Sequence, residues 1–337
     1  VAGLAPALVE RGCELGLYGV FRRGNVPAVR QAPPGARLVA WPVHSRLRDL
    51  LGLLRLTSAD RVVGGCDLVH HTNYLRPPVG ARVPEVMTIH DLTFLENEAW
   101  HEPRATKALL RVVERARAEC AAFCVPSEAT ARACRERLGI EPGRIFVTPL
   151  GVEPRWFRLR ESTGPYLLAV GTLEPRKNHA RLIRAFRAAR LPDLSLRIAG
   201  MKGWLCDDVF AEAANTPGVD LLGHVGESEL ERLVAGASAV VYPSLAEGFG
   251  LPVLEAMAAG RPVLTSSVEP LASLAGEAAL LVDPGDEAAL TDGLRRIVAD
   301  EVLRARLERA GPDRARAFTW NACAEATVRC YRAVIGK

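Results

Sequence analysis

The chain has 337 residues, of which 49% are hydrophobic and 24% are charged, so it is long enough for two globular domains with substantial cores. Its 43 lysine and arginine residues only slightly outnumber its 39 aspartate and glutamate residues and are dispersed along the chain. The net charge of +4 therefore does not predict a nucleic-acid-binding surface, although it would suit phosphorylated or membrane-surface substrates.

The first residues follow helical spacing, with apolar side chains at positions 1, 4, 5, 8 and 9, and Gly12 marks the end of this helix. An α/β domain normally starts with a strand and a turn before such a helix. We therefore expect about one strand of typical length, with its loop, to precede Val1.

Short β-branched or apolar runs then alternate with amphipathic helical patterns. This alternation predicts an α/β fold with parallel sheets and helices on both faces. The predicted strands of the first half are 15–20, 37–41, 67–71, 86–90, 122–125 and 145–148, and those of the second half are 166–170, 194–199, 219–222, 239–242, 262–265 and 279–282.

Residues 151–165 carry turn formers at both ends and show no clear period, which is typical of a linker. We therefore expect an N-terminal domain at 1–153, a linker at 154–164, a C-terminal domain at 165–317 and a terminal segment at 318–337. That segment holds an amphipathic helix at 320–334, after a polar turn at 311–313, and its periodicity leaves open whether it closes the second domain or crosses back to the first. Two doubly wound domains would face each other across a cleft at the carboxyl ends of their strands, so functional residues should follow strands.

A glycine-rich segment follows the predicted strand 239–242. Gly248 and Gly250 allow a ligand to approach the backbone, Pro252 fits the first position of a helix and Gly260 fits its end. The N-terminus of this helix favours an anion such as a diphosphate. Glu247 and Glu255 flank the segment, and either could be an ordinary capping or surface glutamate, but together beside an anion they favour partners that donate from hydroxyls, such as sugar and ribose.

A second motif follows the predicted strand 166–170. Arg176 and Lys177 lie in a strand-to-helix turn before Asn178, which is a plausible N-cap. Two adjacent cations there suit a phosphate, with lysine as a point charge and arginine as a fork. Two solvated surface cations are the alternative interpretation.

With these motifs the chain resembles the retaining glycosyltransferases of family 4, a two-Rossmann-domain (GT-B) type also described as glycosyl transferases group 1, and within it the mannosyltransferase-like members. The resemblance covers nearly the whole chain. The E-x7-E element at 247–255 is the most specific match. The other matching stretches are 67–70, 88–92, 125–127, 148–152, 171–178, 258–263 and 278–284.

The resemblance implies that Lys177, helped by Arg176, neutralises a donor diphosphate, that Glu255 binds ribose hydroxyls and that Glu247 binds the transferred sugar. It further implies donor contacts from the remaining matched positions and an active-site role for His90, which could otherwise simply cap a strand end. Those remaining positions are Gly171, Thr172, Val225, Gly248, Phe249, Gly250 and Leu251. Many relatives have arginine where Thr172 stands, so one phosphate contact is expected to be either absent or supplied by Arg176.

The implied reaction moves a hexose, and mannose is favoured, from a GDP- or UDP-linked donor to a glycan or lipid-linked acceptor in polysaccharide or glycoconjugate synthesis. The sequence contains no D-x-D pair, so we expect neither a metal ion nor another cofactor. Family resemblance implies retention of configuration, with same-face attack preferred to a covalent intermediate on Glu247.

The alternatives are a non-catalytic nucleotide-sugar-binding protein, a nucleotide-sugar isomerase and an NAD-dependent oxidoreductase, although no G-x-G-x-x-G follows a visible strand. The eight cysteines form no C-x-x-C pair and no zinc-ligand spacing. They indicate reduced, mostly buried thiols and a cytoplasmic location, including the cytoplasmic face of a membrane.

Overall fold

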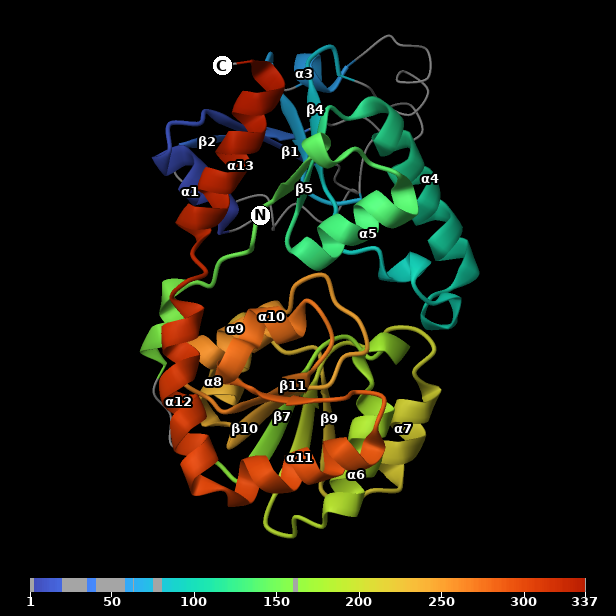
Figure 1. The fold of residues 1–337 in the computed structure, drawn as a ribbon, viewed down its shortest axis with the longest axis vertical. Coiled ribbons are helices and arrows are strands. Elements are labelled where there is room, and N and C mark those ends of the chain that lie inside the picture. The colour runs from blue at the N-terminus through green and yellow to red at the C-terminus, as the bar shows by residue number, and fades with distance from the viewer. Residues whose placement is uncertain are drawn as a thin grey trace. The chain divides into compact units, whose positions relative to one another are not determined.

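The computed structural model describes residues 3–19, 35–40, 58–62, 64–74, 81–159 and 163–336. The chain forms two compact units (Figure 1). Unit 1 consists of Val1–His90, Lys107–Gly151 and Trp320–Lys337, and unit 2 consists of Asp91–Thr106 and Val152–Thr319. The chain therefore contributes Asp91–Thr106 to unit 2 from within the stretch that the sequence pattern places in the first domain.

Unit 1 contains two parallel sheets in the part of the chain that the structure describes. Strands β1 (Leu15–Gly19) and β2 (Ala36–Ala40) pair with each other, and β3 (Val69–His71), β4 (Glu85–Thr88), β5 (Ala122–Val125) and β6 (Ile145–Val147) form a sheet in chain order. The helices that accompany them are α1 (Leu4–Glu10), α3 (Ala59–Val62), α4 (Pro103–Glu119), whose first turn falls in unit 2, and α5 (Glu128–Leu138).

The last helix, α13 (Trp320–Ile335), packs in unit 1. Its Ala324 lies in one apolar cluster with Ala7 and Leu8 of α1, and its Cys330 lies in another with Val86 and Cys124 of the sheet. Of the two arrangements that periodicity left open, the chain thus adopts the return to the first unit.

Unit 2 is built on a six-stranded parallel sheet in the order β12-β11-β10-β7-β8-β9. Its strands are β7 (Tyr166–Val170), β8 (Ser195–Ala199), β9 (Val219–Gly223), β10 (Ala239–Tyr242), β11 (Val263–Ser266) and β12 (Leu280–Val282). Its helices are α6 (His179–Ala189), α7 (Asp207–Ala214), α8 (Glu227–Gly236), α9 (Leu251–Ala258), α10 (Leu271–Ala275), α11 (Glu287–Ala299) and α12 (Glu301–Ala315).

The main core of unit 2 lies on one face of this sheet. Leu196 and Ile198 alternate along β8 and point to this face, where they meet Leu182 of α6 and Leu290 and Leu294 of α11. All of these side chains are fully buried. Every second residue of β8 and one face each of α6 and α11 therefore form a single apolar layer. This layer holds α6 against the sheet and so positions its first turn.

The strand order reverses between β7 and β10, which are neighbours in the sheet but distant in the chain. In a doubly wound sheet, the loops that follow two such strands leave in opposite directions and open a crevice at their carboxyl ends. The loop after β7 contains Arg176 and Lys177, and the loop after β10 contains Glu247. The topology therefore brings the two predicted motifs to one edge of one sheet.

The predicted α/β class is confirmed, and every strand predicted from the sequence is present, with bounds that differ by at most about two residues. The predicted polar turn at 311–313 is wrong, because these residues lie inside α12. A side chain in place of Gly311 would put a Cβ atom 3.0 Å from the backbone oxygen of Met257, so glycine serves here to let α12 pack closely on α9. Pro312 is accommodated within the same helix.

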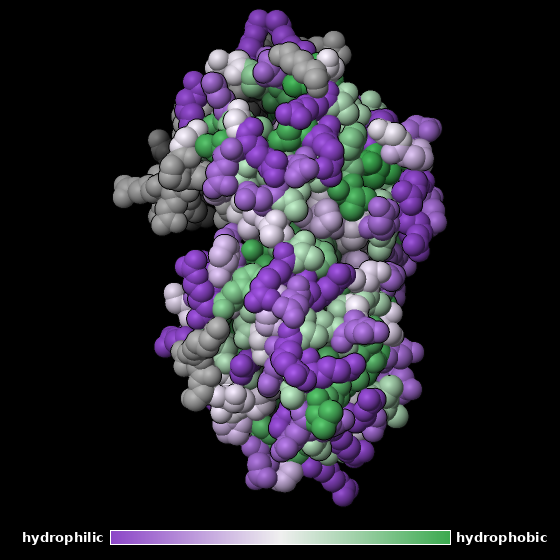
Figure 2. Space-filling model, turned by 60° about the vertical axis from the view of Figure 1, so that its left-hand side comes forward, coloured by the Kyte–Doolittle hydropathy of each residue, from purple (hydrophilic) through white to green (hydrophobic). Residues whose placement is uncertain are grey.

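The visible face in Figure 2 carries hydrophilic residues throughout, interrupted by separate apolar groups. Across the described ranges, no helix is both long enough and apolar enough to cross a membrane. All eight cysteines are free thiols, and six of them are buried.

Candidate functional site

The loop after β7 is held tightly against the end of β8. The backbone N–H of Gly171 donates to the carbonyl of Ala199 (2.9 Å), and Gly171 has a φ of 150°. A Cβ atom on Gly200 would lie only 1.8 Å from the Gly171 oxygen. Glycines at both positions therefore allow two backbones to touch, and this contact fixes the start of the loop.

Asn178 joins the loop after β7 to the loop after β10. It is the N-cap residue of α6, as predicted, but its φ of 64° lies in the left-handed region and its side chain makes no capping bond. Instead, its Nδ2 donates to the carbonyls of Pro243 (3.0 Å) and Pro284 (2.8 Å). The amide thus ties three loops together, leaving the first turn of α6 without a side-chain cap.

The loop after β10 leads into α9 through Gly250, whose φ is 108°. A Cβ atom at this position would lie 2.4 Å from Cδ2 of Leu271, so both the backbone conformation and the packing require glycine. Helix α9 begins at Leu251, which makes Pro252 its second residue rather than its first. No side chain caps this N-terminus, so its first N–H groups face the loop without a protein side chain to satisfy them.

Three side chains from these two loops form a buried network with Tyr242, the last residue of β10. Nζ of Lys177 donates to Oε1 of Glu247 (2.6 Å) and to the hydroxyl of Tyr242 (2.6 Å), and that hydroxyl donates to the same Oε1 (2.9 Å). Arg176 lies 3.0 Å from the other oxygen of Glu247, through its NH1 group. Both oxygens of Glu247 are therefore occupied, and two cations share one carboxylate.

Burial and charge oppose each other within this network. Burial on its own would raise the pKa of Glu247, but Lys177 and Arg176 hold that pKa below its usual value. Burial lowers the pKa of Lys177, and the Glu247 carboxylate counteracts part of this effect. Arg176 also pairs with Glu174 (Nε to Oε1, 2.8 Å), whose pKa is raised by burial. The result is a compact group of cations that an incoming anion could engage only by competing with Glu247.

Glu255, in the second turn of α9, has a different environment. Burial raises its pKa to about 8; Arg155 counteracts this shift, and the nearby carboxylates of Glu227, Glu153 and Glu231 add to it. Arg155 is itself engaged by an ion pair with Glu227 and another with Glu231 (Nε to Oε1, 2.9 Å). The ionised form of Glu255 is thus disfavoured. A hydrogen-bond donor that approached this carboxylate would stabilise it.

The other predicted donor-binding residues fall into two groups. Gly171 and Thr172 lie in the loop after β7. Gly248, Phe249 and Gly250 lie in the loop after β10, and Leu251 is the first residue of α9, so these six lie around the network. Val225 instead lies after β9, the edge strand of the sheet, just before α8. The Phe249 ring is 7% exposed and packs edge-on against Phe318, with ring centroids 6.0 Å apart, so its side chain belongs to the core and only its backbone is available to a ligand.

His90 follows β4 and is the last residue of the first segment of unit 1. Its Nε2 donates to the backbone carbonyl of Thr72 (2.8 Å). This bond assigns the proton to Nε2 in the neutral ring and leaves Nδ1 as an acceptor. The neighbouring Asp91 accepts hydrogen bonds from Thr93 rather than from His90, so the capping arrangement considered from the sequence is not what orients this ring.

Sequence reasoning missed Tyr242 and Arg155. Tyr242 is the last residue of β10, which is the position where parallel strands deliver side chains to their carboxyl edge, so its place in the strand was a usable signal. Arg155 lies in a short 3-10 turn (Pro154–Arg158) within the predicted linker, and nothing in the local sequence connects it with α8 or α9.

Comparison with known proteins gives matches over both halves. The family model described as Glycosyl transferases group 1 matches residues 153–314, and the model described as Glycosyltransferase Family 4 matches residues 1–156. The chain is 36% identical to O-antigen chain mannosyltransferase B of Escherichia coli over 174 residues, an alignment that covers 50% of this chain and 45% of that protein.

Two further comparisons extend over almost the entire chain. A D-inositol 3-phosphate glycosyltransferase of Acidothermus cellulolyticus is 29% identical over 378 residues, covering 98% of this chain and 84% of that protein. The crystal structure of HepE from Anabaena, in complex with UDP and glucose, superposes with a TM-score of 0.76 at 16% identity, covering 98% of this chain and 94% of that one.

Proposed function

Because the chain belongs to glycosyltransferase family 4, with the GT-B fold and a hexosyltransferase activity, we propose that it transfers a sugar from a nucleoside diphosphate donor with retention of configuration and without a metal ion. The acceptor is a glycan or a lipid-linked sugar. The observation that carries this proposal is the contact of Lys177 and Arg176 with Glu247, at the switch point of the sheet and beside the N-terminus of α9.

The donor diphosphate binds where positive charge is already concentrated. Lys177 and Arg176 are largely buried, with side chains 10% and 15% exposed, so their charges act with little screening by water. The uncapped N–H groups of α9 add a partial positive charge. Together they stabilise the negative charge that grows on the departing nucleoside diphosphate, which is the role that a divalent ion performs in metal-dependent transferases.

Glu247 binds the hydroxyls of the transferred sugar. Both of its oxygens accept hydrogen bonds from cations or from Tyr242, and such a carboxylate is a poor nucleophile. We therefore favour same-face attack: the acceptor oxygen bonds to the anomeric carbon as the bond to the phosphate oxygen breaks, and the acceptor proton passes to the departing phosphate. A covalent sugar on Glu247 is the competing mechanism.

We propose contacts for the ribose and the base of the donor from the positions of the remaining residues in the sheet. Glu255 accepts from the ribose hydroxyls, and the backbone near Val225 reads the base. The 36% identity with a mannosyltransferase favours GDP-mannose as donor, with a UDP-sugar as the alternative. We assign His90 to the sugar and the acceptor, with its Nδ1 atom, which the Thr72 contact leaves as an acceptor, as the contacting atom.

The test is to incubate the full chain, in EDTA, with a panel of GDP- and UDP-sugars and a mixture of glycan acceptors, and to follow nucleotide release and product. Wild-type protein should release nucleotide from one donor class in EDTA. Lys177→Met should lower this rate by about 10²–10³-fold, as loss of one preorganised charge at a transition state does, with an unchanged fold by circular dichroism. A matched control is Arg187→Gln, on the exposed side of α6.

Three results would contradict the proposal. Near-normal nucleotide release by folded Lys177→Met would refute the role of Lys177 in stabilising the leaving group. Activity that is restored only by Mg²⁺ or Mn²⁺ would refute metal independence. Tight nucleotide-sugar binding without release, with every acceptor, would favour a non-catalytic binding protein instead.

A further inference from the structure

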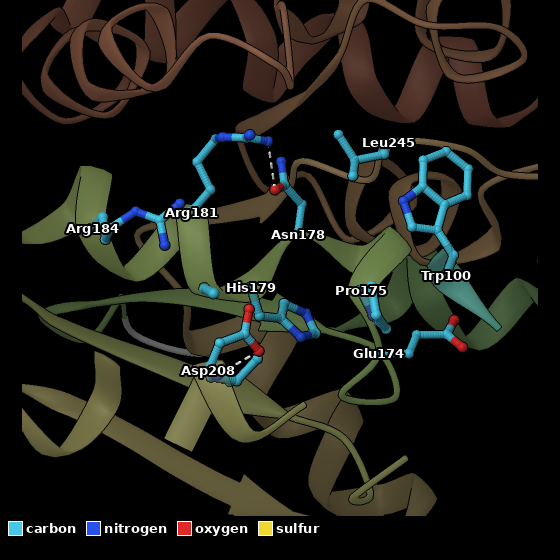
Figure 3. A pocket seen from close by; sticks show the side chains of 11 residues that line it. Trp100, Glu174, Pro175, Asn178, His179, Arg181, Arg184, Asp208 and Leu245 are labelled. Atoms are coloured by element: carbon cyan, nitrogen blue, oxygen red, sulfur yellow. Dashed lines mark hydrogen bonds between the residues drawn. The ribbon is translucent and has the colours of Figure 1, made fainter. Parts of the chain in front are cut away.

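Unit 2 contains a cavity of about 200 Å³ that lies beside the donor network but is separate from it (Figure 3). We call it the Trp100 cavity. Its walls come from the first turn of α6, the start of α7, the loops after β7 and β10, and the segment at 91–106. The lining residues are Trp100, Glu174, Pro175, Asn178, His179, Ala180, Arg181, Arg184, Asp208, Val209 and Leu245. Lys177, Glu247 and Glu255 do not belong to this lining among the described residues.

His179 lines the cavity and has a buried polar atom without a partner. The residue is 2% exposed, and its Nδ1 atom has no hydrogen-bond partner. Burial lowers the pKa of His179 to about 3, with Lys177 adding to the effect, so the ring is neutral at physiological pH. A buried polar atom without a partner is unfavourable, so a ligand hydroxyl that bonded to Nδ1 would stabilise the complex.

The first turn of α6 also opens into the cavity. Asn178, His179, Ala180 and Arg181 are consecutive, and all four line it. The helix is 11 residues long and has no side-chain cap, since Oδ1 of Asn178, the atom that could cap it, accepts from NH1 of Arg181 (2.9 Å). Two independent observations therefore indicate a ligand here. The first N–H groups of α6 have no side-chain partner, and Nδ1 of His179 has none either.

The charges around the cavity balance. Two arginines, Arg181 and Arg184, and two acidic residues, Glu174 and Asp208, line it, so a simple anion or cation would meet as many repelling as attracting groups. Arg184 is already paired with Glu287 (Nε to Oε2, 2.8 Å) and with Glu212 (NH1 to Oε1, 3.3 Å). A neutral polyhydroxy ligand suits such a mixed set, because each hydroxyl both donates and accepts.

Trp100 supplies the apolar part of the site. Its backbone oxygen accepts from Nε1 of Trp204 (2.7 Å), which fixes the segment, and its side chain lines the cavity at the opposite side from Arg184 in Figure 3. A flat aromatic face of this kind packs against the C–H face of a sugar ring. A cavity of ~150 Å³ accommodates benzene, so the space here suits one sugar ring. Asp208 is exposed, so the cavity is reached from solvent on that side.

We propose that the Trp100 cavity is a second carbohydrate site, which holds one sugar residue of a glycan through stacking on Trp100 and hydroxyl bonds to His179, Arg184 and Asp208. Its binding chemistry does not depend on transfer. Its use, to retain a long acceptor glycan on the enzyme, rests on the proposed function.

The test measures sugar binding to the full chain without any donor, by saturation-transfer NMR with methyl α-mannopyranoside and methyl α-glucopyranoside. We expect a dissociation constant of about 1–10 mM, typical of a single small polar ligand. Trp100→Ala should weaken binding by about tenfold or more, since it removes the stacking face but keeps the backbone bond to Trp204. Arg184→Gln should weaken it by about threefold to tenfold.

Arg187→Gln is the matched control. Arg187 lies on the same helix and pairs with the same Glu212 as Arg184, but it does not line the cavity, so its substitution should leave binding unchanged. In transfer assays, Trp100→Ala should raise KM for a long glycan acceptor and leave kcat and the KM for a monosaccharide acceptor unchanged.

The proposal is overturned if no sugar binds at 50 mM, about five times the weakest constant expected, if Trp100→Ala and Arg184→Gln bind as wild type, or if UDP or GDP displaces the sugar. Binding of inorganic phosphate, lost in Arg184→Gln while the sugars fail to bind, would replace it with an anion site. Loss of transfer with intact sugar binding would contradict the proposed function alone, so the two failures are distinguishable.

Discussion

The ammonium group of Lys177 lies 2.6 Å from Oε1 of Glu247, and both side chains are at least nine-tenths buried. In this arrangement the Glu247 carboxylate is paired with the Lys177 ammonium group, which is the cation that a donor diphosphate would need. On the proposed function, binding of the donor would redistribute the hydrogen bonds of Lys177, and Glu247 would accept instead from the sugar hydroxyls. The contact would then couple recognition of the phosphate with recognition of the sugar.

Glu247→Gln separates these two effects. The neutral amide no longer competes for Lys177 and Arg176, so the affinity for GDP or UDP should rise by about threefold to tenfold, while transfer falls by about 10²-fold or more. Titration calorimetry with the nucleotides and turnover assays would measure the two quantities. Weaker nucleotide binding in a folded Glu247→Gln protein would refute the competition. Glu212→Gln, which alters a more exposed ion pair on α7, is the control.

Glu255 should make the stability of unit 2 depend on pH. Its native pKa of about 8 lies above the usual value of 4.5, so the folded state binds more protons than the unfolded state between these pH values. Stability contributed by this group is therefore present at low pH and is lost as pH rises through about 8. Glu255→Gln removes the penalty and should raise Tm at pH 8.5 by about 2–4 °C or more, with the difference vanishing near pH 4.5.

Differential scanning calorimetry across this range would measure the effect, with Glu308→Gln on the exposed face of α12 as the control. A difference in Tm between Glu255→Gln and wild type that stays constant from pH 5 to 9 would mean that the native carboxyl titrates near its unfolded value.

Gly250→Ala tests the entry into α9. The added methyl group would collide with Leu271 at 2.4 Å and would strain a backbone with a φ of 108°. We expect a loss of about 2–4 kcal/mol in the free energy of unfolding, by the combined costs of overpacking and a left-handed conformation. Urea unfolding would measure it. Gly143→Ala is the matched control, since nothing lies within 4 Å of its Cβ position and its φ is not in the left-handed region, and a similar loss there would show that the effect is not local to α9.

His90→Ala should distinguish the acceptor side from the donor side. Because His90 belongs to unit 1 and the nucleotide contacts belong to unit 2, the substitution should lower kcat by about 10²-fold and leave the affinity for GDP or UDP within about twofold. The matched change His90→Gln keeps a group that can donate to Thr72, so rescue by glutamine would identify positioning rather than ring chemistry. A parallel loss of nucleotide affinity would place His90 in donor binding.

Much of the fold could be predicted because its elements have strong local patterns. The strands at 122–125, 166–170 and 239–242 were predicted with the bounds found in the structure, since each is a short apolar run flanked by turn residues. The framed helix after Gly250 was also predictable, because glycine and proline carry specific backbone requirements. Here the chemistry of single residues determines the conformation.

The unpredicted features depend on contacts between distant residues. The packing of α13 on α1 and β5 requires complementary apolar faces that periodicity alone cannot match. The close packing of α12 at Gly311 involves Met257, 54 positions earlier in the printed sequence. The ionisation of Glu255 depends on Arg155 and on α8, and neither adjoins it in the chain.

The contribution of Asp91–Thr106 to unit 2 has a consequence for protein engineering. A chimera that exchanges donor specificity by joining two relatives at a single point near residue 152 would leave Trp100 with the wrong parent, and with it the partner of the Trp204 indole. A transplant that carries 91–106 together with 152–319 would keep this contact and the wall that it builds. A functional exchange of unit 2 therefore requires four joins in the chain, at the two ends of 91–106 and at the two ends of 152–319, instead of one.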